Sequence, residues 1–134
     1  MNTAQDIISA YLAAFNRGDW PGMLALLADD VVHDINQGGA EHGKSAFAAF
    51  LDRMARCYRE ELRDIVIMTA PDASRAAAEF QVHGEYRVQD AGLPPARGQR
   101  YALPAGAFFA LKDRRITRVT MHYNVQEWLR QVAA

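Results

Sequence analysis

The stretch RAAAEFQVHGEYRV, residues 75–88, decides the fold of this chain because its apolar and polar side chains alternate. The residues expected on the buried face are Ala76, Ala78, Phe80, Val82, Gly84, Tyr86 and Val88. Alternation over this length predicts a β-strand with one buried and one polar face. Weaker alternation predicts further strands over 61–69, 99–112 and 115–124. Their direct succession along the chain favours a mostly antiparallel sheet.

Helical patterns precede these strands. Apolar residues spaced three and four apart predict a first helix that begins near Thr3 and ends at Gly18. A short second helix is expected after Asp19, and a third runs to Tyr58. A short strand is expected over 31–35. Helices followed by strands are typical of an α+β fold, so we expect three N-terminal helices on one face of the sheet.

The composition predicts one globular domain spanning residues 1–134. Half of the 134 residues are hydrophobic, which is enough for a single core. The formal charge is -1, and the basic residues are scattered along the chain. A nucleic-acid partner is therefore not expected. No apolar run reaches the roughly 20 residues of a membrane span, and the N-terminus lacks a basic signal region, so a cytoplasmic protein without a membrane partner is expected.

A metal or other cofactor is not expected from the sequence. The four histidines show no metal-ligand spacing, such as the two histidines of HExxH. The single cysteine, Cys57, cannot form an internal disulfide or a CxxC pair. Metal-free chemistry on a small molecule remains the simplest expectation.

Asp34 lies in the apolar segment VVHDI, where a carboxylate is costly to bury unless it is paired or protonated. One interpretation makes it a general base whose apolar neighbours increase its basicity and raise its pKa. The other makes it a strand-ending residue that binds the backbone amides of the following turn. The residues alone leave both open.

Tyr11 lies on the apolar face of the first predicted helix, so its hydroxyl needs a partner if it is buried. It could stabilise negative charge on a substrate carbonyl oxygen, or it could bind a backbone carbonyl as an ordinary core tyrosine. Tyr58, Tyr86 and Tyr123 also fall on inward faces. An aromatic pocket with several phenols suits an apolar ligand that carries a few polar groups.

Three segments carry a family resemblance: YLAAFNRGDW (11–20), LLADDVVHD (26–34) and GKSAFAAF (43–50). They resemble the ketosteroid isomerase-like branch of the nuclear transport factor 2-like (NTF2-like) superfamily. The resemblance implies a cystatin-like cone, in which a curved sheet wraps helices around a deep apolar pocket. It also implies a homodimer that forms through the outer face of the sheet.

The resemblance assigns roles to individual residues. Tyr11 matches the family's oxyanion tyrosine, and Asp34 matches its base when one residue is deleted between Asp30 and Asp34. The position of the family's second oxyanion donor, an acid, is Gly106, which has no carboxyl group. Loss of such a donor typically lowers the rate about a hundredfold or more, so a complete steroid isomerase is not expected. Related branches are similar to dehydratases, epoxide hydrolases and polyketide cyclases.

The sequence therefore predicts a small pocket enzyme of isomerase or lyase type, acting on an apolar small molecule. Asp34 would remove a proton next to a carbonyl, and Tyr11 would stabilise the resulting enolate. The residues expected to bind the substrate are Phe15, Phe50, Met54, Tyr58, Phe80, Val82, Tyr86, Gly106, Phe108, Val119, Met121 and Tyr123. The alternative, motivated by Gly106, is a non-catalytic domain that binds a hydrophobic ligand or only dimerises.

Overall fold

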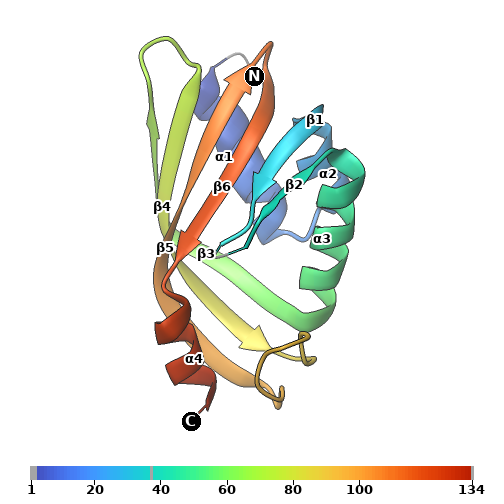
Figure 1. The fold of residues 1–134 in the computed structure, drawn as a ribbon. Helices are drawn as coiled ribbons and strands as arrows, with labels where there is room; N and C mark the ends of the chain where they lie inside the picture. The colour runs from blue at the N-terminus through green and yellow to red at the C-terminus, as the bar shows by residue number, and fades with distance from the viewer. Residues whose placement is uncertain (1–2, 37, 134) are drawn as a thin grey trace.

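A computed structural model describes residues 3–36 and 38–133 as helices covering one face of a six-stranded curved sheet (Figure 1). The helices are α1 (Ala4–Asn16), α2 (Trp20–Ala25), α3 (Lys44–Cys57) and α4 (Val125–Ala133). The strands are β1 (Leu27–Asp34), β2 (Ala40–His42), β3 (Tyr58–Thr69), β4 (Arg75–Tyr86), β5 (Gln99–Lys112) and β6 (Arg115–Tyr123). The predicted α+β class, with three N-terminal helices on a mostly antiparallel sheet, is confirmed.

The helices begin where their capping residues predict. The Thr3 hydroxyl accepts a hydrogen bond from the Asp6 amide at 3.0 Å, and the Asp19 carboxylate accepts one from the Gly22 amide at 2.9 Å. Both side chains satisfy an amide that the first helical turn leaves without a backbone partner. The predicted extent of α3 is wrong at its end, because Tyr58 already belongs to β3.

The strand order is β2-β1-β6-β5-β4-β3, and all pairs are antiparallel except β1 with β6. The strand predicted over 31–35 is longer at its start, since β1 begins at Leu27. The three-residue strand β2 was not expected from the sequence. It pairs with the end of β1 and sets His33 directly opposite Glu41.

Two local features shape the concave face of the sheet. The β3–β4 register shifts between Arg63 and Val66, where Asp64 adopts a φ of 55°. Such a bulge bends and twists a strand. On β4, Gly84 leaves room for the Tyr101 ring, which would collide with any Cβ at this position. The tyrosine can therefore lie flat across its neighbouring strand.

Two amide side chains attach helices to exposed strand edges. Asn16, at the end of α1, both donates to the Leu62 carbonyl (2.9 Å) and accepts from the Leu62 amide (2.8 Å). Gln131 of α4 forms the same pair of bonds with the backbone of Ala102, both at 2.9 Å. Unpaired strand edges otherwise invite association with other chains. These contacts hold α1 against β3 and α4 against β5.

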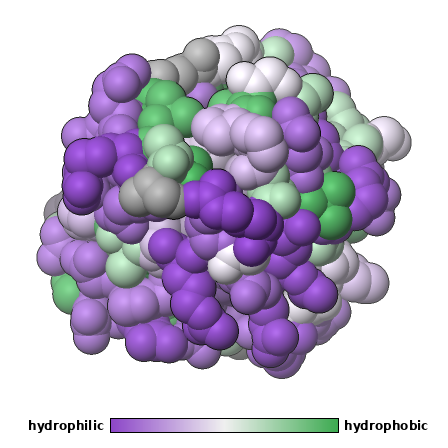
Figure 2. All heavy atoms as spheres, turned by 90° about the horizontal axis from the view of Figure 1, so that it is seen from below, coloured by the Kyte–Doolittle hydropathy of each residue, from purple (hydrophilic) through white to green (hydrophobic). Residues whose placement is uncertain are grey.

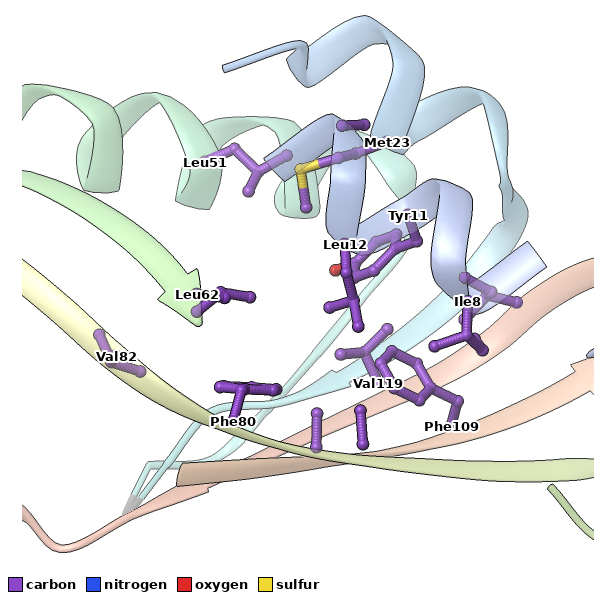
Figure 3. Packing of buried hydrophobic residues seen from close by; sticks show 14 of the residues in the cluster. Ile8, Tyr11, Leu12, Met23, Leu51, Leu62, Phe80, Val82, Phe109 and Val119 are labelled. Atoms are coloured by element: carbon purple, nitrogen blue, oxygen red, sulfur yellow. The ribbon is translucent and has the colours of Figure 1, made fainter. Parts of the chain in front are cut away.

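The core lies between α1, α3 and the concave face of the sheet (Figure 3). Side chains such as Ile8, Phe109 and Val119 meet there from the helix and from the sheet. Seen from the end at which α4 lies, the surface is mostly hydrophilic with small, separate hydrophobic patches (Figure 2). Within the described residues, no helix is long and apolar enough to cross a membrane.

Candidate functional site

A cavity of about 760 Å³ lies between the helices and the concave face of the sheet. Its wall is mainly apolar and aromatic, and it also includes four arginines, two carboxylates, one histidine and four tyrosines. Nine of the residues expected to bind a substrate line this wall: Phe15, Phe50, Met54, Tyr58, Phe80, Val82, Val119, Met121 and Tyr123. A volume of this size accommodates a drug-sized ligand.

Three of the residues expected to bind a substrate do not line the cavity. Phe108 is 56 % exposed on the outer face, where its ring meets His122. Gly106 pairs with His122 on the same strand pair, and a Cβ there would meet the Ala78 carbonyl oxygen, so it forms no part of the pocket wall. Tyr86 is fully buried, and its hydroxyl donates to the Pro94 carbonyl at 2.6 Å. The expectation that Phe108, Gly106 and Tyr86 bind the substrate is therefore wrong.

Asp34 lies on the outer face of the sheet and does not line the cavity. Its carboxylate accepts two hydrogen bonds from Arg118, at 2.7 and 2.8 Å, and one from the Thr120 hydroxyl at 2.6 Å. The Thr120 and Arg118 hydrogen bonds lower the pKa of Asp34, whereas an apolar site would have raised it. The predicted convergence of Asp34 and Tyr11 on one cavity is therefore wrong, as is the predicted contact with the following turn.

Tyr11 does line the cavity, from the face of α1 that points toward the sheet (Figure 3). Its ring packs edge-on against Phe109, with the ring centres 5.6 Å apart. Burial raises the pKa of the phenol, so it remains protonated near neutral pH. Among the described residues, its hydroxyl has no hydrogen-bond partner, and the interpretation as a backbone-bonded core tyrosine does not hold.

Glu60 is a titratable group in the cavity wall that the sequence did not reveal. It lies on β3, and its carboxylate accepts a hydrogen bond from the Tyr101 hydroxyl at 2.5 Å. Desolvation by the surrounding apolar groups raises the pKa of Glu60, although the Tyr101 hydrogen bond partly opposes this. A raised pKa increases the fraction of the protonated carboxyl group, and the protonated group can donate a hydrogen bond.

Further aromatic and charged side chains surround Glu60. The Tyr58 hydroxyl donates to Asp90 at 2.9 Å, and Arg53 forms an ion pair with the same carboxylate at 3.6 Å. Trp128 of α4 packs edge-on against Tyr58 and Tyr101, with ring centres 6.1 and 5.8 Å apart. Burial raises the pKa of both phenols. This end of the cavity thus combines an apolar wall with neutral phenol groups.

His33 lies in another part of the wall and is 4 % exposed. Its ring packs against Phe47 and Phe50, with ring centres 4.6 and 4.5 Å apart. Its Nδ1 is 3.9 Å from Oε1 of Glu41, and neither atom has a hydrogen-bond partner in the described part of the chain. Burial lowers the pKa of His33, so the neutral imidazole is favoured at pH 7. The sequence analysis assigned the site role on this strand to the adjacent Asp34 and gave His33 none.

Glu60 and His33 line the cavity because of which face of its strand each residue occupies. Tyr58, Glu60 and Leu62 share one face of β3, and this alternation would have indicated Glu60 if the strand had been taken to begin at Tyr58. His33 shares its face with the fully buried Val31. Within residues 3–36 and 38–133, no three His, Cys, Asp or Glu residues are grouped to hold a metal ion.

Comparison with known proteins identifies the family. The SnoaL-like domain matches residues 8–119. A candidate polyketide cyclase from Pseudomonas putida KT2440 is 57% identical, with 98% of this chain and 99% of that chain covered and a TM-score of 0.97. A second candidate polyketide cyclase, from Silicibacter sp. TM1040, is 53% identical, with 100% and 98% covered and a TM-score of 0.97.

A more distant similarity shows the fold alone. An epoxide hydrolase of the LEH-like type from M. tuberculosis is 20% identical, with 97% of this chain and 84% of that chain covered and a TM-score of 0.77. No curated protein matches the chain. The resemblance to the NTF2-like superfamily is confirmed, and the chain belongs to the SnoaL-like domain family within it.

Proposed function

We propose that the cavity is an active site that converts an apolar carbonyl compound through its enol or enolate, in an isomerase- or lyase-type reaction. The observation that supports this proposal is the Glu60 carboxyl, which lies in an aromatic wall and is bonded to Tyr101 at 2.5 Å. Its raised pKa increases the fraction of the protonated acid, and the protonated acid can donate to a substrate carbonyl oxygen as negative charge develops there. The Tyr11 phenol, which has no hydrogen-bond partner within residues 3–36 and 38–133, offers a second donor.

The similar candidate polyketide cyclases extend the proposal to carbon–carbon bond formation. Cyclisation of a chain that carries several carbonyl groups requires loss of a proton next to one carbonyl, followed by attack on a second carbonyl. Isomerisation needs the same first step, with the proton returned to another carbon. The proposal therefore concerns the shared enolisation step and leaves the substrate to be identified by mass spectrometry of the natively purified protein.

The test is solvent deuterium exchange into a panel of apolar ketones, including conjugated and β,γ-unsaturated ones, followed by NMR. The wild-type protein should catalyse exchange next to the carbonyl. Glu60→Gln should lower the rate about a hundredfold, which is typical for loss of one oxyanion donor. Glu79→Gln, an exposed residue on β4, is the matched control and should retain the wild-type rate.

Two outcomes would count against this function. Exchange that survives Glu60→Gln would remove Glu60 from the reaction. Tight binding of a ketone without any exchange by the wild-type protein would support the alternative of a non-catalytic hydrophobic-ligand-binding domain. Gly106 does not support that alternative, because it does not line the cavity.

We also propose that two copies associate through the outer face of the sheet. The supporting residues lie along β5, where Pro104, Gly106 and Ala110 alternate onto the same face as Phe108, which is 56 % exposed. Apolar residues at the centre of a patch are typical of homodimer interfaces. Analytical ultracentrifugation should detect a dimer, and Phe108→Asp should shift it to monomer. A monomeric wild-type protein would refute the proposal.

A further inference from the structure

His33 and Glu41 present two complementary polar atoms that face one another without a bond. Nδ1 of His33 and Oε1 of Glu41 are both buried, both lack a hydrogen-bond partner among the described residues, and lie 3.9 Å apart. Buried polar atoms are almost always bonded in folded proteins, so an unsatisfied pair needs an explanation. A movement of about 1 Å would bring them within hydrogen-bond distance.

The backbone holds this pair in register. His33 on β1 and Glu41 on β2 are directly opposite in an antiparallel ladder, so their side chains emerge on the same face. The His33 ring lies against Phe47 and Phe50 of α3, which restricts its rotation. The short strand β2 thus brings a carboxylate to one edge of an imidazole that two phenylalanine rings already orient.

The other edge of the imidazole, which carries Nε2, is available to a substrate in the cavity. His33 lines the cavity wall and Glu41 does not. Because Nδ1 and Nε2 lie on different edges of the ring, a ring whose Nδ1 is directed at Glu41 turns Nε2 away from that residue. A carboxylate at Nδ1 holds the proton there, and this tautomer leaves the Nε2 lone pair free to accept a proton.

We propose that His33 is the base of the cavity, removing a proton from the substrate at Nε2, and that Glu41 positions it. This inference rests on the proposed function, which it completes with a proton acceptor. The C–H bond next to the carbonyl breaks as the new N–H bond forms. The C–H electron pair becomes the enolate double bond, and the carbonyl oxygen gains a hydrogen bond or proton from Glu60. Return of the proton from Nε2 to carbon restores His33.

The charges around His33 suit this role. Glu41 from β2 and Asp34 from its own strand both raise the pKa of His33, but burial lowers it by more. The neighbouring helix α3 contributes two phenylalanine rings, and β6 contributes an apolar valine. The imidazole is therefore neutral at pH 7 and able to accept a proton, and the Glu41 carboxylate stabilises the imidazolium that forms.

The test compares ketone exchange by His33→Gln and Glu41→Gln with that of the wild type across pH. Loss of a general base should lower exchange by His33→Gln about a hundredfold. Glu41→Gln should lower it about tenfold and move the limb of the pH profile that reports His33 to lower pH. His42→Gln, an exposed residue on the same short strand as Glu41, is the matched control and should change neither. Wild-type exchange by His33→Gln, together with loss in Glu60→Gln, would overturn this inference and leave the proposed function intact.

A second measurement tests the interaction between His33 and Glu41 without depending on catalysis. NMR titration of the His33 ring should give a lower pKa in Glu41→Gln than in the wild type, because the carboxylate that favours the imidazolium is gone. An unchanged His33 titration would show that Glu41 does not act on the imidazole and would overturn the proposal. If the wild type catalysed no exchange, the proposed function and the base role would both fail, and the titration would still decide whether Glu41 acts on His33.

Discussion

His33 and Asp34 are adjacent residues on β1, yet their side chains lie in opposite environments. Asp34, on the outer face, has three hydrogen bonds from Arg118 and Thr120. His33, on the cavity face, packs between aromatic rings and has an unpaired Nδ1. The pKa of each is lowered, Asp34 by its hydrogen bonds and His33 by burial.

This difference indicates that the reactive groups lie on the cavity face of the sheet. A carboxylate with all of its partners in place is stabilised as an anion and is a weak base. A buried group that lacks a partner retains the capacity to bind one. Glu60 in the cavity wall differs from the ion-paired carboxylates of the outer face in a second way: its one hydrogen-bond partner among the described residues is the neutral Tyr101 hydroxyl, and burial raises its pKa. The following predictions test the contrast between the two faces, beginning with the largest effect.

The first prediction compares two glycines on the two faces. Gly84→Ala places a methyl group against the Tyr101 ring on the cavity side, where no free space exists. Overpacking of this kind should lower the free energy of unfolding by about 3 kcal/mol and displace Tyr101 from Glu60. Urea denaturation measures the loss. The control, Gly106→Ala on the outer face, meets only the Ala78 carbonyl oxygen at 3.2 Å and should cost much less. Equal losses of unfolding free energy in the two variants would show that the cavity face is packed no more tightly than the outer face.

The second prediction concerns the pH dependence of stability. Because the pKa of Glu60 is raised by burial in the folded protein, the folded state binds more protons than the unfolded state above the ordinary pKa of 4.5. The wild type should therefore lose stability relative to Glu60→Gln as pH rises from 4.5 to the folded pKa, and then level off. Denaturation of both proteins at a series of pH values measures this difference. If the stability difference between the wild type and Glu60→Gln did not change with pH, the pKa of Glu60 would be the same in the folded and unfolded states, and Glu60 would not be desolvated.

The third and smallest effect is expected for Asp34→Asn. Its ion pair with Arg118 is partly exposed, with 51% of the Arg118 side chain accessible, so its loss should cost about 1 kcal/mol or less at pH 7. Since the pKa of Asp34 is lowered, this stability is present above its ordinary pKa of 3.8 and is lost as pH falls through the folded pKa. Ketone exchange should keep nearly the wild-type rate, with only a small shift of the His33 limb of the pH profile to lower pH, because Asp34 contributes the smaller of the two charges that raise the pKa of His33. A large loss of exchange would restore Asp34 as the base.

The long strands were predictable because their alternation reports burial on one side. The strand expected over 75–88 was found over Arg75–Tyr86, and those expected over 99–112 and 115–124 were found within one residue. Helix starts were predictable because Thr3 and Asp19 satisfy backbone amides through short-range contacts. In each case the deciding interaction is local or repeats along the chain.

The phase of β1 was not predictable from its own residues. Apolar side chains stand at Val31, Val32 and Ile35, so neither face is marked, and a one-residue shift exchanges the positions of His33 and Asp34. The pairing with β6 and the Arg118 ion pair decide the phase, and both join residues far apart in the sequence.

The strand β2 and the position of Glu60 were missed for related reasons. Two of the three residues of β2 are exposed, so β2 has no hydrophobic pattern. Tyr58 continues the helical spacing of Met54 as well as the alternation of β3, so the residues between α3 and β3 fit either element. Neither ambiguity can be resolved without the neighbouring strands.

The helix α4 connects the cavity to a backbone edge of β5 that lies outside the cavity wall. Trp128 faces the cavity, while Gln131, one turn further on, binds the backbone of Ala102. Transient detachment of α4 would free both residues at once, and a ligand packed on Trp128 would oppose it. Hydrogen–deuterium exchange at the Ala102 amide therefore reports on occupancy of the cavity from the far side of β5.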